Sequence, residues 1–181
     1  MRLYRVFPYD PGAAQHNEGG ALYIPPASLL GRIANVDLYR ELYFGALPET
    51  AVAESFGFSP AWYADDFIHA SGRPFALAAY GLANTTPIFN LNDTSALAAA
   101  GIPAPSMVVT RQRAVTQQWA RRIYGLRRYA GVAWWSYYGP DCMVYGLWNV
   151  RSVRLAEAPQ ILTTAHPAVV AAATAIVRQI P

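Results

Sequence analysis

The chain contains no lysine and little charge of either sign. All 14 basic residues are arginine, and Asp and Glu together number 11, so the formal net charge at pH 7 is only +3. This charge is too small to indicate nucleic-acid binding by itself. Hydrophobic residues make up 54% of the 181 positions and charged residues 14%, which excludes a disordered chain and predicts a sizeable core.

Cysteine and histidine are also scarce. The single cysteine, Cys142, excludes an internal disulfide and fits a reducing, cytoplasmic compartment. His16, His69 and His166 lie far apart and show no metal-ligand spacing. We therefore expect no metal site, three loop or cap histidines, and Cys142 in the core.

No apolar run is long enough to cross a membrane. The longest covers residues 167–177, about half of the ~20 residues that a membrane-spanning helix needs. The start, MRLYRVFPYDPG, has no apolar stretch of the signal-peptide kind. We expect no membrane association, and interpret residues 167–177 as a helix that is buried or forms an interface between copies of the chain.

The common nucleotide-binding and hydrolase motifs are absent. The sequence contains neither GxGxxG nor GxxxxGK[ST], and neither GxSxG nor HExxH. These absences argue against a Rossmann dehydrogenase, a P-loop enzyme, a serine hydrolase of the nucleophile-elbow kind and a zinc protease.

The hydrophobic patterns that are present predict an α+β fold in one domain, residues 1–181. Strand-like runs cover residues 3–7, 21–24, 38–45, 131–136 and 142–150, the last two forming a hairpin with a wide loop. Residues 75–82 and 87–93 look like two elements around a turn, and VRLAE and PQILT extend the sheet. Helical patterns cover residues 48–56, 95–102 and 116–125. Most strands are expected near the two ends of the chain.

The helix at 116–125 carries the clearest amphipathic pattern. Val115, Trp119, Ile123 and Tyr124 form an apolar stripe at helical spacing. A basic stretch surrounds it, consisting of Arg111, Arg113, Arg121, Arg122, Arg127 and Arg128. A solvated face is the simplest interpretation, and a docking surface for an acidic partner or nucleic acid is the alternative.

Two groups of carboxylates raise the question of acid–base chemistry. Glu54 lies among apolar neighbours in the helix at 48–56, where Pro48 suits the first turn and Gly57 follows the end. Asp65 and Asp66 follow Trp62 and Tyr63. From composition alone, all three are best explained as solvated side chains.

Several segments taken together resemble the RES-domain family. GRIANVDLYRELYFGALPETAVAE at 31–54 resembles its core motif and places the family's arginine, tyrosine and glutamate on Arg32, Tyr43 and Glu54, each 11 positions from the next. GVAWWSYYGPDCMVYGLW resembles the serine strand and places the serine on Ser136, and LYRVF places a basic residue on Arg5. LNDTSALAAAGIP and TQQWARRIY resemble the family's middle section and its Thr-Gln helix. Tyr23 in ALYI offers a rival position for the tyrosine, but only Tyr43 precedes an Ala-x-x-Glu helix.

The resemblance implies both a fold and an activity. The fold would be similar to ADP-ribosyltransferase toxins, with a mixed sheet flanked by short helices. The expected activity is that of a bacterial toxin that cleaves NAD+ by hydrolysis or phosphorolysis, with NAD+ as substrate and no required cofactor, and with an antitoxin or immunity protein as partner. The alternatives are transfer of ADP-ribose to a protein and a catalytically silent binding module.

The resemblance also implies a role for each matched residue. Arg32, assisted by Arg5, would bind the pyrophosphate through its guanidinium fork. Tyr43 would offer an aromatic face to a base, and Glu54 would bind a ribose hydroxyl and stabilise the developing cation. Ser136 would hydrogen-bond the carboxylate or the ribose and would not act as a nucleophile. Four neighbouring aromatic residues would line the pocket: Trp134, Trp135, Tyr137 and Tyr138. Strand alternation would place Trp134 and Ser136 on one face and Trp135 on the other.

Overall fold

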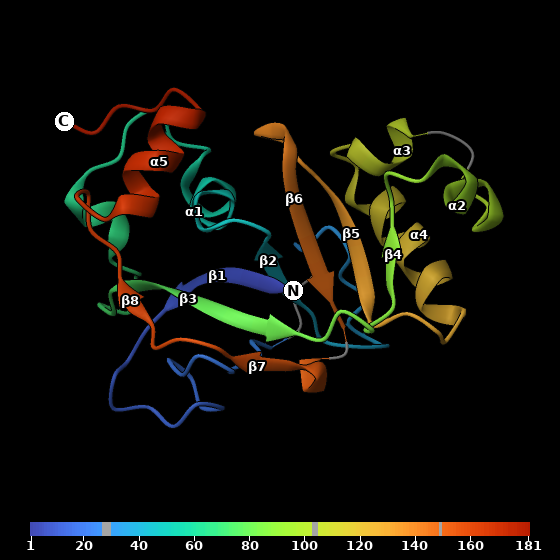
Figure 1. The fold of residues 1–181 in the computed structure, drawn as a ribbon, viewed down its shortest axis with the longest axis horizontal. Coiled ribbons are helices and arrows are strands. Elements are labelled where there is room, and N and C mark those ends of the chain that lie inside the picture. The colour runs from blue at the N-terminus through green and yellow to red at the C-terminus, as the bar shows by residue number, and fades with distance from the viewer. Residues whose placement is uncertain (27–29, 103–104, 149) are drawn as a thin grey trace.

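A computed structural model of the protein describes residues 1–26, 30–102, 105–148 and 150–181. Its centre is one mixed sheet with the strand order β4-β5-β6-β2-β1-β3-β7, and β8 pairs with β3 beside β7. Every pairing is antiparallel except that of β4 with β5. Figure 1 shows that the sheet is strongly curled, so that β4, β5 and β6 run steeply across the direction of β1 and β3.

The elements follow one another along the chain as follows. The strands are β1 (Arg2–Pro8), β2 (Leu42–Gly45), β3 (Phe75–Leu82), β4 (Ile88–Asn90), β5 (Gly131–Ser136), β6 (Gly139–Leu147), β7 (Val153–Leu155) and β8 (Gln160–Ile161). The helices are α1 (Pro48–Phe56), α2 (Thr94–Ala99), α3 (Ser106–Val109), α4 (Arg113–Gly125) and α5 (Pro167–Ala175), with short 3₁₀ turns at Ala64–Phe67 and Val150–Ser152.

The two halves of the sheet meet at a narrow joint. β1 pairs with β3 over seven residues, from Arg2 opposite Gly81 to Pro8 opposite Phe75. By contrast, β1 pairs with β2 at a single position, Tyr4 opposite Gly45. Because a sheet twists most freely where few ladder hydrogen bonds constrain it, the halves diverge beyond this joint. The space between them is where the functional residues gather.

Three apolar clusters fill the layers around the sheet. One lies under α2, α3 and α4 and includes Trp119, Ile123 and Trp134. The second joins α1 to α5 at the other end of the molecule, as Figure 1 shows, and includes Val52 and Val169. The third packs the segment after β1 against the sheet. The apolar C-terminal run is therefore buried against α1, which confirms the buried-helix interpretation.

Helix α1 is positioned by a tight turn before its first residue and by a hydrogen bond just after its last. A Cβ at Gly45 would lie 2.6 Å from the Ala51 backbone nitrogen, so the turn from β2 into α1 requires glycine. Pro48 occupies the first helical turn, as its fixed φ favours. At the far end, Arg178 Nη2 donates to the Gly57 carbonyl at 2.7 Å. Both ends of the helix that carries Glu54 are thus fixed.

Much of the predicted secondary structure is confirmed. The helix at 48–56 has the predicted bounds, the strands expected at 3–7 and 131–136 are present as β1 and β5, and the element expected at 75–82 is the strand β3. The helices expected at 95–102 and 116–125 form as α2 and α4 with slightly earlier starts and, for α2, an earlier end. VRLAE and PQILT contribute β7 and β8 to the sheet. The α+β class is confirmed.

Four expectations about strands are wrong. Residues 21–24 form turns and irregular chain, and the run at 38–45 pairs only from Leu42. The hairpin loop is a two-residue turn, with Ser136 opposite Gly139. β3 and β4 also stand mid-chain rather than near an end. The apolar side chains of 21–24 are buried by packing on the sheet, so their burial needs no strand pairing. No helix among the described residues is long and apolar enough to cross a membrane.

Candidate active site

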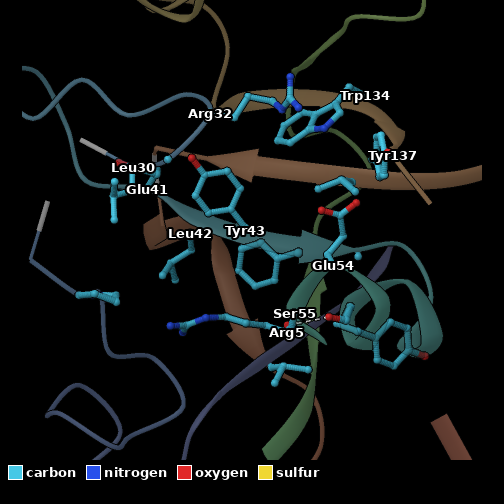
Figure 2. Close-up of a pocket in the computed structure, with 18 of the residues that line it drawn as sticks. Arg5, Leu30, Arg32, Glu41, Leu42, Tyr43, Glu54, Ser55, Trp134 and Tyr137 are labelled. Atoms are coloured by element: carbon cyan, nitrogen blue, oxygen red, sulfur yellow. Dashed lines mark hydrogen bonds between the residues drawn. The ribbon is translucent and has the colours of Figure 1, made fainter. Parts of the chain in front are cut away.

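A cavity of about 720 Å³ lies beside the joint between the two halves of the sheet. Its walls come from β1, β2, β5, β6, α1 and the segment before β2 (Figure 2). Four of the five residues matched to the RES motif lie on its surface: Arg5, Arg32, Tyr43 and Glu54. The fifth, Ser136, bonds directly to Glu54, so the structure brings the whole predicted set together.

Glu54 and Ser136 form the carboxylate side of the cavity. Glu54 is on the exposed face of α1, while Ser136 at the end of β5 is only 2% exposed. Ser136 Oγ donates to Glu54 Oε1 at 2.5 Å and accepts a bond from the Tyr138 backbone N–H at 3.0 Å. The Tyr138 bond directs the Ser136 proton toward Glu54. The carboxylate is therefore held in one orientation at the edge of the cavity.

Tyr43 occupies the middle of the cavity wall. Its hydroxyl accepts a hydrogen bond from the Ile33 backbone N–H at 3.2 Å. Its ring meets Trp134 edge-on, with centroids 6.3 Å apart. Burial raises the pKa of the Tyr43 phenol well above its ordinary value, so the hydroxyl stays neutral. The rival residue, Tyr23, lies on a loop and offers its backbone carbonyl to Arg5.

Arg32 supplies positive charge above Tyr43, as Figure 2 shows. Its Nη1 donates to the carbonyls of Val108 at 2.7 Å and Thr110 at 3.1 Å, which anchors one corner of the guanidinium to α3. Burial lowers its pKa, nearby Arg113 lowers it further, and Glu54 acts in the opposite direction. Arginine remains charged under such shifts, so the cavity has a fixed cation.

Arg5 is more deeply placed than its expected role requires. It is 9% exposed, and Nη1 donates to the carbonyls of Ala21 and Tyr23 at 3.4 and 3.2 Å. Burial lowers its pKa, and the Tyr80 hydroxyl opposes that effect. These contacts hold the 21–24 loop on the sheet. Arg5 borders the cavity, and its bonds to the two carbonyls assign it a structural part in shaping the wall.

Simple strand alternation does not extend from the tryptophans to Ser136, because a bulge between Trp135 and Ser136 shifts the register of β5. Trp134 and Trp135 come before the bulge, opposite Val144 and Met143, and both line the cavity. Tyr137 forms the rim, while Tyr138 packs with the core between α1 and α5 instead of walling the cavity.

The structure adds charged residues that the motif did not identify. Arg113, at the start of α4, lines the cavity, and Arg111 donates to the Tyr137 hydroxyl at 2.9 Å on its rim. Both belonged to the basic stretch interpreted as a solvated face. Glu41, just before β2, lines the opposite end. Sequence spacing gave a partial signal for Glu41, since it stands two positions before Tyr43 and so shares its face.

The other candidates stay outside the cavity. His166 caps α5 by accepting a bond from Ala168 N, and His69 contacts Ser71 in an exposed turn. Asp66 accepts from the Tyr63 backbone N–H, as a capping residue would. Cys142 is half-buried in β6. Among the described residues, no group of three or more His, Cys, Asp or Glu is placed to hold a metal ion.

The site therefore combines three chemical features on one concave surface. Arg32 and Arg113 can receive an anionic group, Tyr43 and Trp134 present aromatic surface, and Glu54 held by Ser136 can accept a hydroxyl proton or face a cation. A ligand that suits all three carries phosphate, a planar ring and a sugar.

Comparisons with known proteins agree with this geometry. One chain of the crystal structure of the M. tuberculosis MbcT–MbcA toxin–antitoxin complex superposes with a TM-score of 0.58 and 14% sequence identity, covering 91% of this chain and 85% of that one. This likeness supports the fold. A comparison with curated proteins gives no match. The family model of the RES domain matches residues 2–174, and the chain therefore belongs to the RES domain family.

Proposed function

We propose that the protein cleaves the nicotinamide–ribose bond of NAD+, as a glycohydrolase or phosphorylase, and acts as a toxin. The observation that carries this proposal is the hydrogen bond from Ser136 to Glu54 at the edge of a cavity that also contains Arg32 and Tyr43. A carboxylate fixed in this way is suited to a reaction that develops positive charge on a sugar ring.

Each of these residues would contact a different part of NAD+. The unanchored edge of the Arg32 guanidinium, with Arg113 close by, would bind the pyrophosphate oxygens. Tyr43 and Trp134, which meet edge-on, would offer an aromatic wall to the nicotinamide ring. Since Ser136 occupies Oε1 of Glu54, we assign Oε2 to a hydroxyl of the nicotinamide ribose. No added cofactor enters this scheme.

Bond cleavage then needs little from the protein beyond position and charge. The bond between ribose C1′ and the nicotinamide nitrogen breaks, and its electron pair neutralises the pyridinium, so the leaving group requires no acid. The oxocarbenium ion that remains is stabilised by the Glu54 carboxylate. Water or phosphate then forms the new bond to C1′, which gives ADP-ribose or its 1″-phosphate. For water, the proton released passes to solvent through Glu54.

A toxin of this kind needs an inhibitor in the cell that makes it. The MbcT–MbcA structure is described as a toxin–antitoxin complex, and its likeness in fold supports a separate antitoxin or immunity protein for this chain. The exposed pair of Arg111 and Tyr137 on the cavity rim offers such a protein a place to bind.

The direct test follows NAD+ by proton NMR with purified protein, in buffers with and without phosphate. We expect free nicotinamide to appear at the same rate as NAD+ is lost. ADP-ribose would identify a hydrolase, and a phosphorylated product seen only with phosphate would identify a phosphorylase. The Glu54→Gln variant keeps the shape of the side chain but loses its charge, and it should reduce turnover by at least about 100-fold.

Two controls make the test decisive. Glu157→Gln removes the same charge from an exposed ion pair with Arg2 and should leave turnover unchanged. Labelled NAD+ added to a cell lysate separates free ADP-ribose from label on a macromolecule, the product of a transferase. If the wild type consumes no NAD+, or Glu54→Gln consumes it at the parental rate, the proposed mechanism is wrong.

A further inference from the structure

A second carboxylate, Glu41, lines the cavity far from the Glu54–Ser136 pair. Glu41 stands immediately before β2, and Tyr43 follows two positions later on the same face of the chain. In Figure 2, Tyr43 lies between Glu41 and Glu54, with Leu30 beside Glu41. The cavity therefore has one carboxylate at each end, although the reaction proposed above uses only Glu54.

Glu41 is half-buried, and one of its carboxylate oxygens lacks the partner that a buried acceptor normally has. Its Oε2 atom is inaccessible to solvent, and no hydrogen-bond donor among the described residues reaches it. No arginine or histidine of the described chain lies within 4.0 Å of it as an ion-pair partner. Burial raises the pKa of the Glu41 carboxyl, and a bond from its own backbone N–H acts in the opposite direction. An unsatisfied acceptor of this kind costs about 1–3 kcal/mol, which favours an explanation by function.

Gly31 lies close to the ends of the Glu41 and Tyr43 side chains. A Cβ added at Gly31 would lie 2.8 Å from Glu41 Oε1 and 2.4 Å from the Tyr43 hydroxyl oxygen, so a larger residue here would displace both side chains. The Gly31 carbonyl is held by Gln117 Nε2 at 3.0 Å, which ties this segment to α4. The carboxylate and the phenol therefore meet at one fixed point of the wall.

A substrate hydroxyl suits a carboxylate of this kind, and it would bond Oε1, because Oε2 is closed to solvent and so to a ligand. In dinucleotide-binding folds, an acidic residue that receives the adenosine ribose 2′-OH favours NAD+ and disfavours the 2′-phosphate of NADP+. The same chemistry applies here irrespective of fold, since a phosphate would place a second anion against the unpaired carboxylate.

We propose that Glu41 accepts a hydrogen bond from the 2′-hydroxyl of the adenosine ribose of NAD+ and thereby selects NAD+ over NADP+. This inference rests on the proposed function, because it takes the Glu54 end of the cavity as the place of the nicotinamide ribose. With Arg32 and Arg113 on the pyrophosphate between them, the dinucleotide spans the cavity from Glu54 to Glu41. Glu41 is then a specificity residue that does not touch the bond being broken.

The test measures kcat and KM for NAD+ and NADP+ with the wild type, Glu41→Gln and Glu41→Ala. A lost hydrogen bond to a charged group should raise KM for NAD+ about 10-fold or more and leave kcat within about 2-fold. Removing the negative charge should lower the ratio of kcat/KM for NAD+ to kcat/KM for NADP+ by about 10- to 100-fold. Glu157→Gln, which removes an equal charge outside the cavity, should leave both values unchanged.

Binding measurements separate this inference from the proposed function. Calorimetric titration of Glu54→Gln and of Glu54→Gln/Glu41→Gln with NAD+ and NADP+ needs no turnover, and melting curves identify any variant that fails to fold. Loss of the NAD+ preference on removing Glu41 supports the inference even where no turnover is seen. An unchanged ratio of the two dissociation constants overturns it. A change confined to the ratio of the dissociation constants of NAD+ and its hypoxanthine analogue also overturns it, because Glu41 would then bind the adenine amino group.

Discussion

Ser136 Oγ donates a 2.5 Å hydrogen bond to Glu54 Oε1 although 82 positions separate the two residues in the sequence. The serine ends β5 and the glutamate lies on α1, so the bond joins two elements that come from opposite halves of the chain. Because Ser136 also accepts from Tyr138 N, its proton is directed at the carboxylate. The pair behaves as one unit, and its function depends on both members.

Replacing Ser136 with alanine should damage turnover more than substrate binding. The Glu54 carboxylate loses the donor that orients it, while the cavity keeps its arginines and aromatic wall. We expect kcat for NAD+ to fall about 10- to 100-fold with little change in KM, in line with about 1.5–3 kcal/mol for a hydrogen bond to a charged group. Steady-state kinetics by nicotinamide release measures both constants.

Ser59→Ala provides the matched control, because that hydroxyl bonds to the Ala61 carbonyl away from the cavity. Its kinetics should equal those of the parent. A Ser136→Ala protein that raised KM and kept kcat would place the serine in substrate binding and not in the orientation of Glu54.

Replacing Arg32 with lysine should weaken binding of the pyrophosphate although the charge is kept. Lysine cannot anchor on the carbonyls of Val108 and Thr110 and present a planar fork to phosphate at the same time. We expect kcat/KM for NAD+ to fall by about 10- to 150-fold, as about 1.5–3 kcal/mol of charged hydrogen bonding would predict.

Arg122→Lys is the control for that change, since Arg122 is exposed and donates to the Gly101 carbonyl at 2.8 Å, away from the cavity. Melting curves should accompany both variants, because Arg32 also ties two loops together. Parental kcat/KM in a folded Arg32→Lys protein would contradict the assignment of Arg32 to the phosphates.

Local sequence signals predicted the parts of the site that depend on neighbours in the chain. Pro48 and the apolar face of the following residues predicted α1 with its observed bounds, and Tyr43 follows from the strand before it. The motif spacing then placed Arg32, Tyr43 and Glu54 on one cavity. These residues lie within 23 positions, so short-range geometry limits how far apart they can be.

Long-range packing decided what the sequence could not. ALYI at 21–24 has the composition of a strand, but Arg5 and Tyr80 bond its Ala21 carbonyl and hold it as a loop. The bulge in β5 depends on its register with β6, so alternation could not be carried from Trp135 to Ser136. Arg113 and Glu41 look like ordinary surface charges until the walls around them are assembled.

Removing the Arg178 side chain should destabilise the end of α1. Its Nη2 and Nε donate to the Gly57 carbonyl at 2.7 and 3.1 Å, which satisfies a backbone acceptor just past the helix. We expect Arg178→Ala to lower the free energy of unfolding by about 1–2 kcal/mol, or Tm by about 2–4 °C per kcal/mol. Thermal denaturation followed by circular dichroism measures the shift.

Arg151→Ala serves as the comparison, because Arg151 is exposed and should change Tm by less than about 1 °C. Hydrogen exchange adds a local measurement. If the amides of α1 exchange no faster in Arg178→Ala than in the parent, the cap contributes nothing to the helix that carries Glu54.

Alkaline pH should destabilise the protein partly through Tyr80. Burial raises the pKa of its phenol to about 12 in the folded protein, despite the opposing effect of nearby Arg5. The unfolded value is about 10, so both states are protonated below pH 10 and the contribution to stability is complete there. Between about pH 10 and 12 only the unfolded state loses the proton, and the free energy of unfolding falls by about 1.4 kcal/mol per pH unit for this group.

The Tyr80→Phe variant tests this sign directly by urea denaturation from pH 8 to 11.5. At neutral pH it should be less stable by about 1 kcal/mol, because the Tyr80 hydroxyl donates to the Ala21 carbonyl at 2.7 Å. Above pH 10 its free energy of unfolding should fall less steeply with pH than that of the parent, and the difference in slope should correspond to about one bound proton. Tyr63→Phe, at a side chain that is 58% exposed, should keep the parental slope. An equal slope in Tyr80→Phe would show that Tyr80 ionises alike in the folded and unfolded chains.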